Sequence, residues 1–176
     1  WETSAESWIE SIGEHGDWLR TWVLDPVMLQ LVGEARRVLD VGCGEGRFAR
    51  MLQSKGAHVV GIDPVSRLLR QARSRSIETT LVKGVGEALP FRARSFDAVV
   101  SYLTLIDIAD FRGAIREMAR VLKPGGIFFA AEYTNSAMAN YDNVHFEKRD
   151  EAWYREYYRV NLLFMKGKKA LGRGDD

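Results

Sequence analysis

The chain of 176 residues has few of the residues that build disulfide frameworks and metal sites: one cysteine, Cys43, and three histidines. A single cysteine cannot form a disulfide within the chain, and zinc-ligand spacing is absent, so we predict no metal site and a reducing, cytoplasmic compartment. No apolar run is long enough for a membrane span, and no secretory signal is visible. The net charge of +1 is too small to hold nucleic acid by charge alone, so we expect no nucleic acid as a partner.

Strand and helix patterns alternate from Arg37 onward. Apolar runs predict strands at residues 38–41, 58–62, 79–82, within 96–105, at 127–131 and at 160–166. One-sided apolar spacing predicts helices at residues 47–54, 66–74 and 111–122, and a further helix is expected at 151–158. This alternation implies right-handed crossovers, so we predict an α/β fold: a doubly wound, mostly parallel sheet with helices on both faces.

The first 35 residues have a different pattern, with three tryptophans, Trp8, Trp18 and Trp22, at helical spacing. Asp25-Pro26 is typical of a helix cap followed by proline at the first helical position, and Gly33 would end that helix. We therefore predict an N-terminal helical segment at 1–35, a lid or cap, on a body at 36–176. The tryptophans are more often core residues than ligand contacts, and both interpretations stay open.

Residues 40–46, Asp-Val-Gly-Cys-Gly-Glu-Gly, lie between the first predicted strand and the first helix. Their glycines allow a sharp turn and let a ligand approach without obstruction by Cβ atoms. Asp63 ends the next strand, where a ribose would lie, so the pattern indicates an adenosine-containing cofactor. A dinucleotide is disfavoured because Arg47 stands where its fingerprint has a small residue, and the bulky Arg47 would obstruct the close approach of the helix. Asp40 before the glycines also suits a cationic amino group.

Four motifs in order over residues 36–131 carry a resemblance to a known family. They are VLDVGCGEG at 38–46, GIDP at 61–64, GEALPF with SFD at 86–97, and LKPGG at 122–126. This set resembles class I S-adenosylmethionine-dependent methyltransferases, nearest to the small-molecule enzymes of the ubiquinone and menaquinone type. The resemblance implies a Rossmann-like fold, S-adenosylmethionine as cofactor, and a last strand that is antiparallel beside the fifth.

The resemblance also implies roles for particular residues. Asp40 would hold the methionine moiety, Asp63 the ribose hydroxyls, and Tyr102 would line the methyl region, while Leu89 would touch the adenine. One departure is Val85, where the family often has an aspartate for the adenine amino group. A backbone carbonyl is the favoured substitute, ahead of Glu87 and of a reduced cofactor affinity. The implied cofactor-binding residues are Asp40, Gly42, Cys43, Gly44, Gly46, Asp63, Pro64, Val65, Val85, Gly86, Glu87, Tyr102 and Leu103.

The expected reaction is in-line methyl transfer to an oxygen or nitrogen atom of a small-molecule acceptor, helped by a nearby base. His145 and Tyr133 are the catalytic candidates, since both follow the fifth strand. Asp107 is either a base or a helix cap. His15 is expected at the surface, and His58 is discounted because it begins the second strand at the end far from the site. Aromatic residues at 141–158 fit either an acceptor pocket or a helix core.

Two further readings stay open for the chain as a whole. The last strand has no evident hairpin partner, so the acceptor site could need a second chain, and a homodimer is one such assembly. The other is a protein that binds S-adenosylmethionine without transferring a methyl group.

Overall fold

The computed structural model describes residues 1–76, 78–133 and 162–168, with side chains described up to residue 131. Its body is a six-stranded sheet in the order β3-β2-β1-β4-β5-β6. β1 (Arg37–Val41), β2 (His58–Asp63), β3 (Thr80–Lys83), β4 (Phe96–Tyr102) and β5 (Leu122–Tyr133) pair in parallel. The predicted α/β fold with a parallel Rossmann-like sheet is confirmed. β6 (Leu162–Lys168) pairs antiparallel with β5, two residues later than the strand expected at 160–166.

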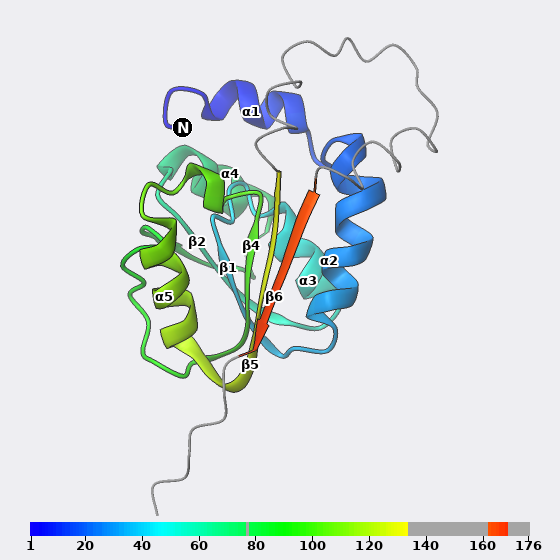
Figure 1. Cartoon of the computed structure of the whole chain (residues 1–176). Helices are drawn as coiled ribbons and strands as arrows, with labels where there is room; N and C mark the ends of the chain where they lie inside the picture. Colours follow the sequence, from blue (N-terminus) through cyan, green and yellow to red (C-terminus); the bar gives the residue numbers. More distant parts are fainter. Residues whose placement is uncertain (77, 134–161, 169–176) are drawn as a thin grey trace, which may run out of the picture.

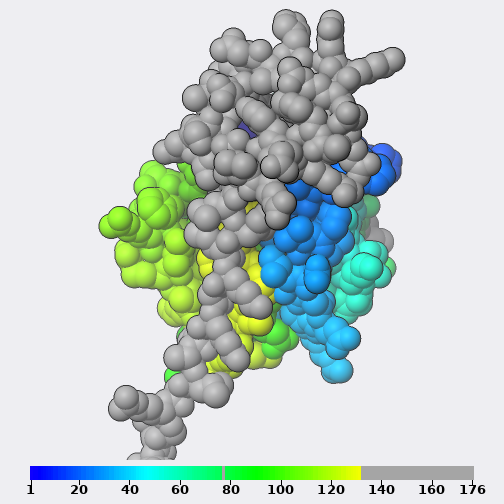
Figure 2. Space-filling model, turned by 45° about the vertical axis from the view of Figure 1, so that its right-hand side comes forward, coloured from blue at the N-terminus to red at the C-terminus, as the bar shows by residue number. Residues whose placement is uncertain are grey.

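Helices cover both faces of this sheet (Figure 1). α2 (Asp25–Val32) and α3 (Arg47–Ser54) bury Met28 and Phe48 in one core cluster with Phe129 of β5. α5 (Phe111–Val121) buries Met118 in a second cluster with Val99 of β4. α4 (Ser66–Arg75) follows β2 and contacts β3 and β2. Figure 2 shows α2 in blue and α5 in green on either side of β5 in yellow.

The N-terminal segment forms α1 (Ala5–Ile12), a π-helical turn η1 (Arg20–Leu24) and then α2. α1 packs on α4, where Ala5, Val65 and Leu68 form a small cluster of their own. α1 thereby lies across the carboxyl ends of the strands, at the top of Figure 1. The segment predicted as a lid therefore sits over the edge where open α/β sheets bind ligands.

The turn before the fifth strand differs in detail from the sequence expectation. α5 ends at Val121 and β5 begins at once with Leu122, ahead of the predicted 127–131. The pairing then shifts from Phe96↔Leu122 to Ala98↔Ile127, so residues 123–126 form a bulge within the strand. The predicted helix at 151–158 lies outside the described residues.

Candidate functional site

A cavity of about 240 Å³ lies between α1 and the carboxyl ends of β1, β2 and β4. It gathers every residue predicted to bind a cofactor except Gly46, although those residues come from four separate parts of the sequence. Gly46 is instead the N-cap residue directly before α3, where a Cβ atom would lie 3.0 Å from that of Ala72. Leu89, expected on the adenine, is buried in the second core cluster away from the cavity lining.

The three glycines at positions 42, 44 and 46 have different structural roles. All three have positive φ angles, +74° at Gly42, +53° at Gly44 and +79° at Gly46. A Cβ atom on Gly42 would overlap the Thr104 side chain at 2.1–2.7 Å, so this glycine is needed for internal packing. A Cβ atom on Gly44 would meet only Leu68, at 4.0 Å, and both residues line the cavity. Gly44 is therefore the glycine that keeps space open for a ligand.

Asp40 presents a buried carboxylate that its surroundings leave incompletely paired. The residue is 1% exposed, and its Oδ1 atom has no hydrogen-bond partner in the described part of the chain. Burial, with the charges of Asp63 and Glu45, raises the pKa of the Asp40 carboxyl to about 7. A buried polar atom without a partner is costly, so a cationic donor bound in the cavity would relieve it. An ammonium group fits this requirement.

Asp63 lies at the end of β2 and faces the same cavity. The amide of Gly44 donates to one carboxylate oxygen at 2.9 Å, and that of Val65 donates to the other at 2.8 Å. Burial raises the pKa of Asp63, and these two hydrogen bonds oppose that shift. Each oxygen keeps a further lone pair, so the carboxylate is held in place yet can still accept two hydroxyl donors.

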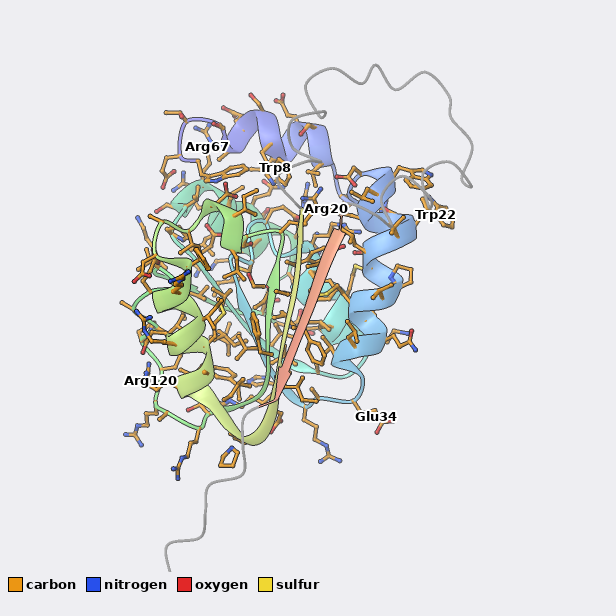
Figure 3. All side chains as sticks on the ribbon, in the orientation of Figure 1. Trp8, Arg20, Trp22, Glu34, Arg67 and Arg120 are labelled. Carbon is orange, nitrogen blue, oxygen red and sulfur yellow. The ribbon has the colours of Figure 1, made fainter. Side chains whose placement is uncertain are left out.

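The N-terminal segment forms the cavity wall opposite the sheet, so part of this segment can contact a ligand. Trp1, Trp8, Ile12 and Arg20 line the cavity. The Arg20 guanidinium lies 5.0 Å from the Trp8 ring centroid, and both labelled side chains lie between α1 and the strand ends in Figure 3. Trp18 packs against the first core cluster and Trp22 is 57% exposed, so helical spacing alone could not tell which tryptophan faces a ligand.

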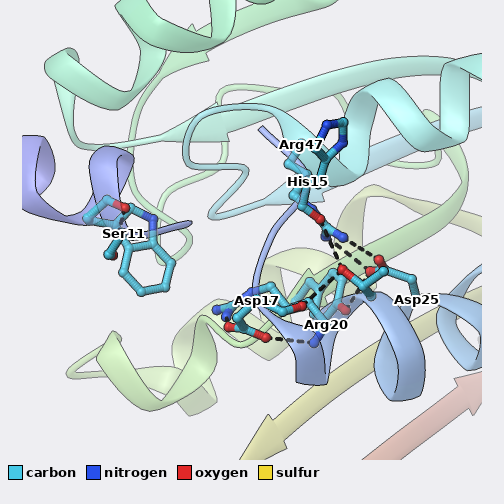
Figure 4. Close-up of polar contacts among 9 residues, drawn as sticks. Ser11, His15, Asp17, Arg20, Asp25 and Arg47 are labelled. Atoms are coloured by element: carbon cyan, nitrogen blue, oxygen red, sulfur yellow. Dashed lines mark hydrogen bonds and ion pairs between the residues drawn. The ribbon is translucent and has the colours of Figure 1, made fainter. Parts of the chain in front are cut away.

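A buried polar cluster joins this segment to the body, and it corrects two interpretations (Figure 4). Asp25 is no helix cap: its carboxylate forms an ion pair with Arg47, with one contact of 3.1 Å, and accepts from the Tyr102 hydroxyl at 2.7 Å. Arg47 does not obstruct the approach of α3 to the glycine-rich turn, because its side chain points toward the N-terminal segment, where it contacts His15 and Asp25. Burial and the charge of Asp25 raise the pKa of Tyr102, so this hydroxyl acts as a donor rather than a base.

The structure also places the remaining candidates. Asp107 lines the cavity, and burial raises its pKa; the cap of α5 is Asp110, which accepts from the Gly113 amide at 2.8 Å. The side chain of His15 is exposed, as expected, and His58 is the first residue of β2, outside the cavity lining. Tyr133 is the last residue of β5, at the same sheet edge as the cavity, and His145 and residues 141–158 lie outside the described part.

Comparison with known proteins assigns the family. Residues 39–130 match a family model described as a methyltransferase domain. The chain belongs to the class I S-adenosylmethionine-dependent methyltransferase family. S-adenosylmethionine is the cofactor of this family, and the unpaired Asp40 oxygen and the opening at Gly44 fit its ammonium group and its approach.

Curated relatives of this methyltransferase domain act on different acceptors by name. The chain is 35% identical over 111 residues to a demethylmenaquinone methyltransferase of Corynebacterium urealyticum, covering 63% of this chain and 47% of the relative. It is 36% identical over 106 residues to a malonyl-[acyl-carrier protein] O-methyltransferase of Erwinia pyrifoliae, and the match covers 60% of this chain and 40% of that relative. The chain thus spans about half the length of the curated relatives it matches.

Among solved structures, the PH0226 protein of Pyrococcus horikoshii resembles this chain with a TM-score of 0.70 and 20% identity. The match covers 95% of this chain and 84% of the PH0226 chain. This likeness shows the fold of the methyltransferase domain. No helix among residues 1–76, 78–133 and 162–168 is long and apolar enough to cross a membrane.

Proposed function

We propose that this domain binds S-adenosylmethionine in the cavity and transfers its methyl group in line to an oxygen or nitrogen atom of a small-molecule acceptor. The observation that carries the proposal is the Asp40 carboxylate, buried in the cavity wall with one oxygen unpaired. The cofactor supplies an activated methyl group on a good leaving group. The chain mainly has to orient the two reactants, which can contribute about 7–11 kcal/mol to the lowering of the barrier.

Each part of the cofactor has a suitable group in the cavity wall. Asp40 would accept from the ammonium group, and the fixed carboxylate of Asp63 from both ribose hydroxyls. Pro64 and Val65 would cover an adenine face. Val85 is 42% exposed and lines the cavity, so its backbone carbonyl is our candidate for the adenine amino group. Tyr102 and Leu103 would border the methyl group.

Leu103 supports its assignment through its backbone. It has a φ of +57°, a conformation that costs a residue with a side chain about 1–2 kcal/mol. Its amide donates to the carbonyl of Ala131 on β5 at 2.8 Å, which holds the strained conformation at the cavity wall. Strain of this kind gathers at functional sites because the surroundings fix a required geometry.

The acceptor is the second reactant of the proposed transfer. The names of the relatives include a quinone acceptor and a carrier-bound acid, so we propose a small-molecule acceptor without naming it. Asp107 borders the cavity and is a candidate base alongside Tyr133 and His145.

Calorimetry with S-adenosylmethionine, S-adenosylhomocysteine and NAD tests which cofactor binds, and a panel of acceptors then tests methyl transfer. Binding of NAD alone would refute the proposal, and binding without transfer to any acceptor would favour a cofactor-binding protein.

Replacing Asp63 with alanine is expected to weaken S-adenosylhomocysteine binding by about 1.5–3 kcal/mol, the usual contribution of hydrogen bonds to a charged group. Calorimetry of the two proteins measures the difference. Asp97→Ala is a suitable control because Asp97 lies near the amino end of β4, outside the cavity lining, where it pairs with Lys123 at 2.7 Å. A dissociation constant that Asp63→Ala leaves unchanged would contradict the ribose contact.

Cofactor affinity is also expected to depend on pH through Asp40. The pKa near 7 means that the free carboxyl is largely protonated below pH 7, whereas an ammonium ligand requires it ionised. Binding must therefore release a proton at low pH, so affinity rises on going from pH 5.5 to pH 7, on the order of tenfold, and levels off above. Calorimetry in buffers of different ionisation enthalpy counts the proton released. Asp40→Asn should bind weakly and lose this pH dependence; a parent protein without it would refute the ammonium contact.

A further inference from the structure

Two arginines of the body hold the loop that follows α1. Arg75 of α4 donates to the backbone carbonyl of Gly13 at 3.1 Å, and Arg47 of α3 donates to that of His15 at 2.7 Å. Each arginine also binds a buried carboxylate: Arg75 pairs with Glu45 at 2.5 Å, and Arg47 with Asp25. Glu45 and Arg47 flank Gly46, so both contacts start next to the glycine-rich turn of the cofactor cavity.

The contact made by Arg47 is the more enclosed of the two. Arg47 is 8% exposed and Asp25 is 3% exposed. Asp25 also accepts from Tyr102, so this carboxylate ties the start of α2 to both α3 and the end of β4. The three side chains cannot separate without leaving a buried charge or hydroxyl unpaired, which is strongly unfavourable.

Gly16 shows how closely Arg47 packs against the loop. Its φ is +85°, and a Cβ atom there would lie 2.5–3.0 Å from the Arg47 guanidinium group. Gly13, three residues earlier, has a φ of +61° and no atom within 4 Å of its Cβ position. The two glycines therefore share a positive φ and differ in whether a side chain would displace Arg47.

We propose that Arg47 is a positioning residue that fastens the N-terminal segment over the cofactor cavity and thereby sets how long the cofactor stays bound. The segment it fastens contributes Trp8, Ile12 and Arg20 to the cavity wall. A cofactor lying between this wall and the glycine-rich turn would leave more readily when the segment moves, and that movement breaks the contacts of Arg47. The inference rests on the proposed cofactor site.

The test compares Gly16→Ala with Gly13→Ala, using S-adenosylhomocysteine as the probe. Its release is followed in stopped flow by tryptophan fluorescence, which Trp8 in the cavity wall should report. We expect release from Gly16→Ala to be at least about tenfold faster than from the parent protein, and release from Gly13→Ala to stay within about twofold. Arg47→Lys, which keeps the charge but loses the two-pronged contact, should also release faster. Equal release rates in Gly16→Ala and Gly13→Ala would overturn the inference.

Hydrogen exchange without any ligand separates this inference from the cofactor assignment. Amides of residues 17–24 should exchange faster in Gly16→Ala than in Gly13→Ala, because Arg47 no longer holds the loop. Equal exchange in the two variants would overturn the fastening role. A parent protein that binds no S-adenosylhomocysteine would refute the proposed function and with it the effect on release, whereas the exchange measurement would still show whether Arg47 fastens the segment.

Discussion

Replacing Gly44 with valine is expected to weaken S-adenosylhomocysteine binding more than a hundredfold, a loss of about 2.7 kcal/mol or more, while the domain still folds. The valine side chain would enter the cavity, because a Cβ atom at Gly44 meets no protein atom nearer than Leu68 at 4.0 Å. The φ of +53° adds a backbone cost of about 1–2 kcal/mol to the free energy of folding. Calorimetry measures the loss of binding, and thermal unfolding measures the loss of stability.

Gly56→Val is the matched control for this substitution. Gly56 follows α3 with a φ of +88°, and its Cβ position has no atom within 4 Å, but it does not line the cavity. Both variants therefore carry the strain of a left-handed backbone, and only Gly44→Val fills the cavity. Equal affinities in the two variants would show that the ligand does not pass close to Gly44.

The fold could be predicted from the sequence because its signals are local. The predicted strands 38–41 and 58–62 lie within a residue of the observed strands β1 and β2, and all of their residues except His58 are buried. One-sided apolar spacing predicted the bounds of α3 and α4 equally well. Parallel strands bring their carboxyl ends to one edge, so the gathering of Asp40, Asp63 and Tyr102 followed from topology alone.

The roles of individual glycines could not be predicted in the same way. Spacing shows that residues 42, 44 and 46 form a turn, but the direction of each absent Cβ atom depends on φ and on distant neighbours. Gly42 faces Thr104 and Gly46 faces Ala72, so two of the three serve contacts with later parts of the chain. Only the folded structure separates these from Gly44.

The polar cluster under the N-terminal segment was missed because local rules gave plausible but wrong answers. Asp25 before a proline is a common cap pattern, yet its partners lie 22 and 77 residues away at Arg47 and Tyr102. Arg47 looked obstructive because its partner in the N-terminal segment could not be known. A charged residue directly after a tight glycine turn, with an aspartate in a neighbouring apolar helix, is the signal that could have suggested an ion pair.

Removing the Asp25 carboxylate should produce a large loss of stability. Asp25→Ala would leave the Arg47 guanidinium group and the Tyr102 hydroxyl without their shared acceptor, and breaking a buried pair in this way costs about 3–5 kcal/mol. At about 2–4 °C per kcal/mol for a domain of this size, the melting temperature should fall by about 6–20 °C. Leu24 and Met28, on either side of Asp25, belong to the main core, so this loss should appear in global unfolding by denaturant.

An exposed ion pair of the same N-terminal segment tests whether burial is the cause. Glu6 pairs with Arg67 at 2.9 Å, and these side chains are 65% and 46% exposed, so Glu6→Ala should cost less than about 1 kcal/mol. The double variant Asp25→Leu/Arg47→Met should recover part of the loss, because it removes both charges instead of leaving one buried. If Asp25→Ala were no more destabilising than Glu6→Ala, the cluster could not be what fixes this segment to the sheet.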